Sequence, residues 1–249
     1  MRRKLITLTT TLALMASTAL AGGLGTMTDA ERSEFRAEVR QYLLDNPEVL
    51  MEAMQALQDR QDKEAAAHDQ LVLSSSKDAV FNDPNSWVGG NPDGDVTVVE
   101  FMDYRCSYCR KAYSEVADMV KADGNIRFIV KEFPILGDDS VASSRFAIAM
   151  RLLHGDGAYE TVHDELITLR GAPDAATLGR LAVKMGYEAQ PLLDMMGDDK
   201  VTAIIAANHQ MGEQLNITGT PTFVVDQTLL RGYLPEAEMQ KIVDQQRAG

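Results

Sequence analysis

The two cysteines of this 249-residue chain, Cys106 and Cys109, lie between a predicted strand and a predicted helix. Residues 96–101 are rich in valine, as buried strands are, and residues 111–116 favour a helix. This junction places Cys106 at the helix N-terminus and Cys109 one turn inside. Free N–H groups and the positive end of the helix dipole stabilise a thiolate there. The sequence therefore predicts a redox site with Cys106 as nucleophile and Cys109 as the shielded resolving thiol.

Other uses of a Cys-x-x-Cys pair are a structural zinc site, an inert disulfide and a copper(I) site. Zinc needs four ligands, and two cysteines supply only two of them. The histidines of the chain are His68, His154, His163 and His209. No two of them have the spacing of the histidine pair in a zinc finger. Copper(I) accepts thiolate ligands, so copper binding remains the alternative to redox chemistry. We expect no bound metal or cofactor, and we place the four histidines on the surface or in the core.

Pro221 lies at the mouth of a second strand-like run, residues 222–225. Proline cannot donate to a central ladder, so it belongs at the start of the strand. A cis Thr220–Pro221 bond would turn the chain sharply and leave the Thr220 backbone free to pair with an extended peptide. The local sequence alone favours the ordinary trans form, because cis is the minority isomer.

Three stretches of the chain resemble the DsbA family of thiol:disulfide oxidoreductases: residues 98–109, 130–137 and 219–223. A fourth, residues 35–50, resembles the extra N-terminal region of the ScsC-like and Com1-like branch of that family. The resemblance implies an α/β, thioredoxin-like fold with an inserted helical domain, preceded by a helical segment. It also implies an enzyme that forms or reshuffles disulfide bonds in client proteins containing cysteines, recycled by a redox partner in the membrane.

Carried over to this chain, the resemblance makes Cys106 the nucleophile, Cys109 the resolving cysteine and Pro221 the cis-proline, with Thr220 beside it contacting the client. Glu100 matches the buried acid beneath the site. Burial raises the pKa of a carboxyl group, and such a group can relay a proton to or from Cys109. The alternative is a glutamate at a strand end that faces solvent.

Two further expectations concern residues near the site. Ser107 and Tyr108 separate the cysteines, where the strongly oxidising DsbA type has proline and histidine. A histidine there helps to hold the thiolate, so this site is expected to oxidise less strongly. For Lys131 and Glu132, at the end of a predicted strand, we expect a solvated face. Oxidase, isomerase and reductase directions stay open.

The first residues read as an export signal, residues 1–21. Residues 2–4 are basic, residues 5–16 are apolar, and Ala19-Leu20-Ala21 is a small-x-small cleavage site. The sequence therefore predicts a periplasmic protein, in an oxidising space where a lone Cys-x-x-Cys pair acts on other proteins. No later stretch approaches 18 apolar residues, so no membrane insertion of the mature chain is expected.

The net charge of −13 disfavours binding to nucleic acid or to an anionic membrane. Because this charge is calculated with the basic residues of the export signal, the mature chain is more acidic still. Proteins with accessible cysteines are therefore the expected partners.

Residues 28–72 are predicted to form an N-terminal helical segment. Thr28 and Glu31 fit a capping box for a helix to about residue 45, and Pro47 fits the first turn of a second helix. Apolar residues form a narrow stripe, which either packs on the chain's own catalytic domain or joins other copies. We favour a homo-oligomer. The stripe consists of Phe35, Val39, Leu43, Leu50, Met54 and Leu57.

Residues 80–249 are predicted to form the catalytic domain, after a linker at Ser74–Ser76. A helical insertion at about residues 138–209 is expected to overhang the cysteines. The expected strands are residues 96–101, 126–132, 222–225 and 229–231, and helices are expected at about 106–122, 141–153, 175–185, 200–215 and 235–246.

Overall fold

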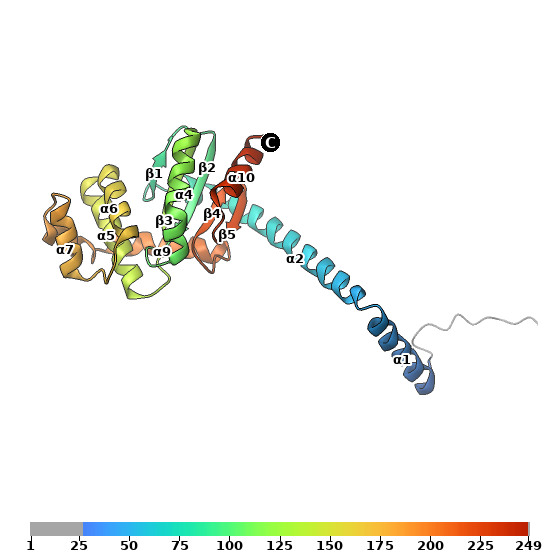
Figure 1. The fold of residues 1–249 in the computed structure, drawn as a ribbon. Helices are drawn as coiled ribbons and strands as arrows, with labels where there is room; N and C mark the ends of the chain where they lie inside the picture. Colours follow the sequence, from blue (N-terminus) through green and yellow to red (C-terminus); the bar gives the residue numbers. More distant parts are fainter. Residues whose placement is uncertain (1–26, 249) are drawn as a thin grey trace, which may run out of the picture. The chain divides into compact units, whose positions relative to one another are not determined.

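The computed structural model describes residues 27–248 (Figure 1), so the predicted export signal at residues 1–21 lies outside the described part. The chain divides into two compact units, Met1–Arg60 and Gln61–Gly249. The first contains α1 (Asp29–Asp45) and the beginning of α2 (Glu48–Ser75). The second contains the sheet and all the other helices.

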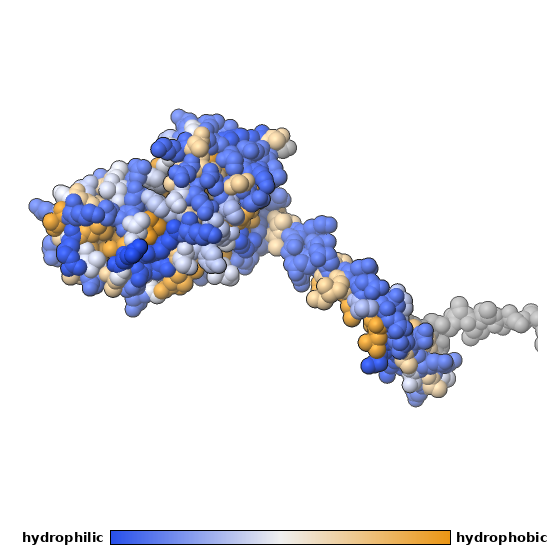
Figure 2. Space-filling model, viewed as in Figure 1, coloured by the Kyte–Doolittle hydropathy of each residue, from blue (hydrophilic) through white to orange (hydrophobic). Residues whose placement is uncertain are grey.

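In the first unit, α1 begins at the predicted capping box. The Glu31 N–H donates to Thr28 Oγ1 at 3.3 Å, and the Thr28 N–H donates to Glu31 Oε2 at 2.7 Å. No residue of α1 is buried. Hydrophobic side chains therefore lie on the surface of α1 and the first half of α2 (Figure 2), including most of the apolar stripe. The exposed members of the stripe are Phe35, Val39, Leu50, Met54 and Leu57.

The linker expected at Ser74–Ser76 is wrong, because α2 continues through Ser75. The Ser74 and Ser75 hydroxyl groups donate to the carbonyl groups of Leu71 and Val72 at 2.9 and 3.0 Å, so the helix itself satisfies them. This last part of α2 belongs to the second unit. It is followed directly by the short helix α3 (Lys77–Phe81).

Two buried residues of α2 dock its end in the second unit. Leu73 is buried in the core. The carboxylate of Asp69, which is also buried, accepts two hydrogen bonds from the Arg231 guanidinium group at 2.8 and 2.9 Å. Burial of Leu73 and this bidentate pair favour a continued helix over a flexible linker.

The second unit is built on a five-stranded sheet of order β1-β3-β2-β4-β5. Its central strand β2 pairs in parallel with β3 and antiparallel with β4. The four strands expected from the sequence are present, and β1 was missed because it is short and two of its four residues are glycines, which are depleted in strands. The strands are β1 (Trp87–Gly90), β2 (Val96–Met102), β3 (Ile126–Glu132), β4 (Thr222–Val225) and β5 (Thr228–Arg231).

Helices cover both faces of this sheet. On one face, α4 (Ser107–Asp123) and α10 (Glu236–Ala248) pack on β2 and β4 through Val98, Val116, Met119, Phe223 and Val243, among others. On the other face, α3, α9 and the end of α2 pack through Leu73, Val80, Val99, Phe101 and Leu215. Because side chains alternate along a strand, Val99 and Phe101 point to one face and Glu100 to the other, toward α4.

Five helices lie between β3 and β4 and form the predicted insertion. Figure 1 shows α5, α6 and α7 grouped beside the sheet. Two helices of the insertion, α6 and α8, were not predicted individually from the sequence. The insertion consists of α5 (Asp138–His154), α6 (Asp156–Thr168), α7 (Ala175–Lys184), α8 (Ala189–Met195) and α9 (Asp199–Gln214).

The solvated face expected for Lys131 and Glu132 is wrong, since both side chains are buried. Lys131 Nζ donates to Asp83 Oδ2 at 2.8 Å and to the Ala79 carbonyl at 2.9 Å. Glu132 accepts hydrogen bonds from Tyr104. Their partners are distant in the sequence, so the local pattern of two charged residues at a strand end did not indicate burial.

Candidate active site

The two cysteines lie at the N-terminal end of α4, as the sequence predicted. Cys106 is the N-cap residue, with φ −73° and ψ 122°, and Cys109 lies in the first turn. The exposed fraction is 7% for Cys106 and 1% for Cys109. Both are free thiols in this structure. A reagent approaching from solvent therefore meets Cys106 first, and Cys109 lies beneath it.

The Thr220–Pro221 turn faces Cys106. This peptide bond is cis, as the family resemblance implied and the local sequence did not. Pro221 directly precedes β4, and the Thr220 carbonyl accepts a hydrogen bond from Cys106 Sγ at 3.1 Å. On its other side, the Pro221 carbonyl accepts from the Gly232 N–H at 3.0 Å. The turn is thus held between α4 and the loop after β5.

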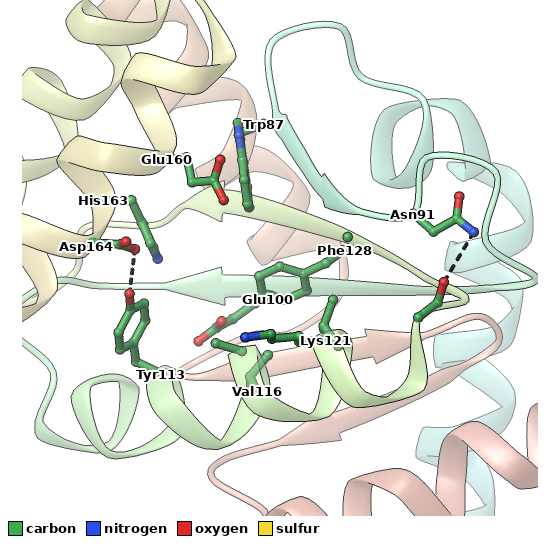
Figure 3. Close-up of a pocket in the computed structure, with 14 residues that line it drawn as sticks. Trp87, Asn91, Glu100, Tyr113, Val116, Lys121, Phe128, Glu160, His163 and Asp164 are labelled. Carbon is green, nitrogen blue, oxygen red and sulfur yellow. Dashed lines mark hydrogen bonds between the residues drawn. The ribbon is translucent and has the colours of Figure 1, made fainter.

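Glu100 lies between the sheet and α4, with an exposed fraction of 5%. The solvent-facing alternative is therefore wrong. Figure 3 shows its side chain beside Val116 and Tyr113, in a cavity of about 500 Å³ that Trp87 also lines. Burial raises the pKa of Glu100 to about 8, and the negative charge of Glu132 adds to the shift. Near neutral pH, Glu100 is a protonated acid.

Cys109 shares this environment. Burial raises the pKa of its thiol far above the ordinary value, and the charge of Glu100 raises it further. The Cys109 Sγ also accepts a weak hydrogen bond from the Asp103 N–H at 3.5 Å. A thiol of this kind stays protonated near neutrality.

Sequence comparison identifies both parts of the chain. The profile described as Thioredoxin matches residues 82–245. The chain belongs to the thioredoxin family. The profile described as Copper resistance protein ScsC N-terminal domain matches residues 31–64, within the N-terminal helical segment.

Solved structures agree with this assignment. A thioredoxin-like oxidoreductase from Silicibacter pomeroyi DSS-3 is 41% identical with a TM-score of 0.65, and the match covers 69% of this chain and 98% of that one. Proteus mirabilis ScsC in a compact conformation is 27% identical with a TM-score of 0.64, over 87% and 98% of the two chains. A periplasmic thioredoxin-like protein from Salmonella enterica serovar Typhimurium is 25% identical with a TM-score of 0.63, over 70% and 96%. Together with the two profile matches, these structures make the chain a thioredoxin-family protein of the DsbA and ScsC type.

Two curated relatives are much longer than the matched region. Na(+)/H(+) antiporter NhaA 1 of Salinispora arenicola is 28% identical over 139 residues, which are 56% of this chain and 21% of the antiporter. The match to NhaA 3 of Salinispora tropica has the same extent. This chain spans about a fifth of each antiporter, so ion transport does not carry over. In the part of the chain that the structure describes, no helix is long and apolar enough to cross a membrane.

A cluster of buried polar side chains joins the loop before Cys106 to the inserted helices. This cluster was not predicted from the sequence. The hydroxyl groups of Tyr104 and Tyr159 donate to Glu132 Oε1 at 2.8 and 2.5 Å. The Tyr104 hydroxyl also lies 2.9 Å from His163 Nδ1. Because that hydroxyl has a single proton, Nδ1 of His163 is the donor in this contact.

The members of this cluster have strongly shifted pKa values. Burial raises the pKa of Glu132 to about 7, against the opposing effect of its tyrosine hydrogen bonds. Burial lowers the pKa of His163 to about 4, so the imidazole is neutral near pH 7. Trp87 stacks on Tyr159 with ring centroids 5.6 Å apart. The cluster fixes Tyr104, two residues before the nucleophile, against the inserted helices.

Asp103 holds the loop before the nucleophile from its other side. This aspartate is fully buried. Its Oδ1 accepts from the Arg105 N–H at 2.7 Å, and its Oδ2 accepts from the N–H groups of Ile135 and Leu136 at 2.8 and 3.1 Å. The residue was missed because the acceptor role depends on a segment about 30 positions further along the chain. The loop is therefore anchored on both sides before α4 begins.

Proposed function

We propose that this chain is exported to the periplasm, where it forms or reshuffles disulfide bonds in client proteins through Cys106 and Cys109. One observation carries the proposal: Cys106 Sγ lies at the N-terminus of α4, 3.1 Å from the Thr220 carbonyl beside Pro221. A client backbone that pairs with Thr220 would bring its own sulfur next to Cys106. The Salmonella relative described as periplasmic supports the proposed location.

The exchange begins when a client thiolate attacks Cys106 Sγ of the oxidised pair. A bond forms between the two sulfurs, the Cys106–Cys109 bond breaks, and its electron pair goes to Cys109 Sγ. Glu100, protonated near pH 7, supplies the proton that Cys109 takes up. A second client thiolate then attacks the client's sulfur and releases an oxidised client and reduced enzyme. In the reverse direction, Cys106 attacks a wrong disulfide and permits reshuffling.

The N-terminal segment is proposed to join copies of the chain. Most of its apolar stripe is exposed in the first unit, and the ScsC N-terminal profile covers residues 31–64 of the same segment. Association would remove these side chains from water. It would also hold several catalytic sites together, which favours isomerase activity because a client released from one site stays at high effective concentration near the others. A membrane protein is the proposed redox partner that recycles the cysteines.

Copper binding is the competing function for the same cysteines. The segment that matches the copper-resistance domain, residues 31–64, contains neither cysteine nor histidine. Among the described residues there is no group of three or more His, Cys, Asp or Glu side chains placed to hold a metal. Thiolate binding of copper would depend on Cys106 and Cys109, and burial holds the proton on Cys109 strongly. This chemistry favours exchange over metal storage.

One experiment separates the two functions. The oxidised protein is mixed with a reduced unfolded client, the reduced protein with a scrambled client, and the reduced protein is titrated with Cu(I) in parallel. Recovery of native client disulfides, absent in the Cys106→Ser control, supports the oxidoreductase. Tight Cu(I) binding with no client turnover would replace it with a copper carrier.

A further inference from the structure

One face of α4 forms a stripe that begins beside the nucleophile. Tyr108, Lys111 and Glu115 are three and four positions apart, so they lie above one another on the helix. Tyr233, from the loop after β5, lies along this stripe. Its hydroxyl donates to the Glu115 carboxylate, with distances of 2.8 and 2.9 Å to the two oxygens. Lys111 Nζ is 4.1 Å from the centroid of the Tyr233 ring, a cation–π contact.

The Tyr108 ring completes this arrangement. It stacks on Tyr233 with centroids 6.2 Å apart and an interplanar angle of 28°. Even so, 58% of Tyr108 remains exposed, the largest exposed aromatic surface next to the cysteines. Hydrogen bonding and the cation–π contact thus hold Tyr233, and Tyr233 holds Tyr108. An ordered ring that stays open to solvent is suited to binding, because little side-chain entropy is lost when a partner covers it.

The stacked pair borders the position proposed for the client backbone. Tyr108 is two residues after Cys106, whose Sγ lies 3.1 Å from the Thr220 carbonyl. The Gly232 N–H, one residue before Tyr233, donates to the Pro221 carbonyl at 3.0 Å. The Tyr108–Tyr233 pair and the Thr220–Pro221 turn are therefore tied together around the nucleophile. A client cysteine bonded to Cys106 would therefore have the exposed Tyr108 ring near its neighbouring side chains.

We propose that Tyr108, held by Tyr233 and Lys111, selects clients with an aromatic side chain next to the reacting cysteine. This inference rests on the proposed oxidoreductase function and names its substrate preference. Aromatic rings prefer offset-stacked or edge-to-face contacts, and the exposed surface of Tyr108 offers both. Tyr108 makes the contact, whereas Tyr233, Lys111 and Glu115 are positioning residues.

The test uses short peptides in mixed disulfide with thionitrobenzoate. Cys106 of the reduced full-length protein attacks the peptide sulfur, and the sulfur–sulfur bond to thionitrobenzoate breaks. The coloured thionitrobenzoate thiolate leaves with the electron pair. Cys109 then attacks Cys106, releasing the peptide thiol and leaving the enzyme disulfide. Peptides with phenylalanine before or after the cysteine are compared with an otherwise identical alanine peptide.

The readout is the ratio of the second-order rate constants for thionitrobenzoate release from the phenylalanine and alanine peptides, so a general change in thiol reactivity cancels. In the wild type we expect a ratio of roughly three- to ten-fold for one of the two phenylalanine positions, the range typical of aromatic pairs. Tyr108→Phe should keep the ratio and Tyr108→Ala should reduce it to about one. Tyr233→Ala should lower it, because Tyr108 then loses its support.

Two outcomes would overturn the inference: a wild-type ratio near one for both phenylalanine positions, or an undiminished ratio in Tyr108→Ala. Failure of the proposed function looks different. In that case the wild-type protein releases thionitrobenzoate from every peptide, including the alanine peptide, no faster than the Cys106→Ser variant does. Circular dichroism of Tyr108→Phe and Tyr108→Ala checks that both variants are folded.

Discussion

Replacing Glu100 with glutamine should stabilise the protein, and the gain should increase with pH. Burial raises the pKa of Glu100 from 4.5 to about 8, so the folded state disfavours the ionised form. When folding raises the pKa of a carboxyl group, stability is lost as the pH rises from the pKa of the unfolded state to the pKa of the folded state. Glutamine has nearly the same shape and does not ionise, so Glu100→Gln should escape this loss.

The magnitude follows from the two pKa values. Each pH unit between 4.5 and about 8 costs the wild type about 1.4 kcal/mol relative to the variant. The difference in unfolding free energy should be near zero below pH 4.5, about 3 kcal/mol at pH 7 and about 5 kcal/mol above pH 8. The pKa of Glu100 belongs to the form with free thiols, so the measurement is made on the reduced protein.

Urea unfolding of wild type and variant between pH 5 and pH 9 measures this difference. Trp87, the single tryptophan of the chain, lies in the second unit and provides the fluorescence signal. Glu160→Gln is the matched control, because Glu160 lines the same cavity but is exposed. A difference between Glu100→Gln and wild type that stays constant across this pH range would refute the assignment of Glu100 as a buried, protonated acid.

Three further predictions follow from other parts of the molecule. Cys109→Ser should accumulate a mixed disulfide with client proteins and Cys106→Ser should not, as non-reducing gels would show, because only Cys106 is open to a client sulfur. Asp123→Asn should lower the free energy of unfolding by about 1 kcal/mol at pH 7. Hydrogen bonds from Arg247 lower the pKa of Asp123 from 3.8 to about 2. This contribution to stability is therefore present above pH 3.8 and should vanish as the pH falls through 2. Urea unfolding at pH 7 and pH 3 should show that the difference between variant and wild type shrinks at the lower pH. The double variant Val39→Glu with Leu50→Glu should convert an oligomer into a monomer by light scattering, since both side chains are exposed members of the apolar stripe; a wild-type chain that is already monomeric at micromolar concentration would end that proposal.

The predictions from sequence succeeded where structure depends on neighbouring residues. The run of valines before Cys106 and the helix-favouring residues after it are local signals, and β2 and α4 form there. The capping box at Thr28 is local in the same way. The cis form of Thr220–Pro221, in contrast, was indicated only by resemblance, because the contacts that surround the turn come from α4 and from the loop after β5.

The predictions failed where distant segments decide the outcome. A lysine and a glutamate at the end of β3 suggested a solvated face, but Asp83 neutralises Lys131 and two tyrosines bind Glu132. Tyr104 and Tyr159 show no pattern in the sequence that relates them to each other. Ser75 resembles part of a linker, yet its helix continues because Leu73 is buried in a core formed by later strands. In each case a tertiary contact outweighed the local preference.

Asp103 makes the segment just before the helical insertion part of the redox centre for protein engineering. Its carboxylate joins the loop before Cys106 to the segment that leads into α5, through the N–H groups of Arg105, Ile135 and Leu136. In a chimera that replaced the insertion with its junction before Ile135, a backbone that followed a different path past Asp103 would leave one oxygen of a fully buried carboxylate without its two N–H donors. Such an unsatisfied group costs several kcal/mol, on the order of 3. Any recombination of this catalytic domain should therefore place its junction after Leu136.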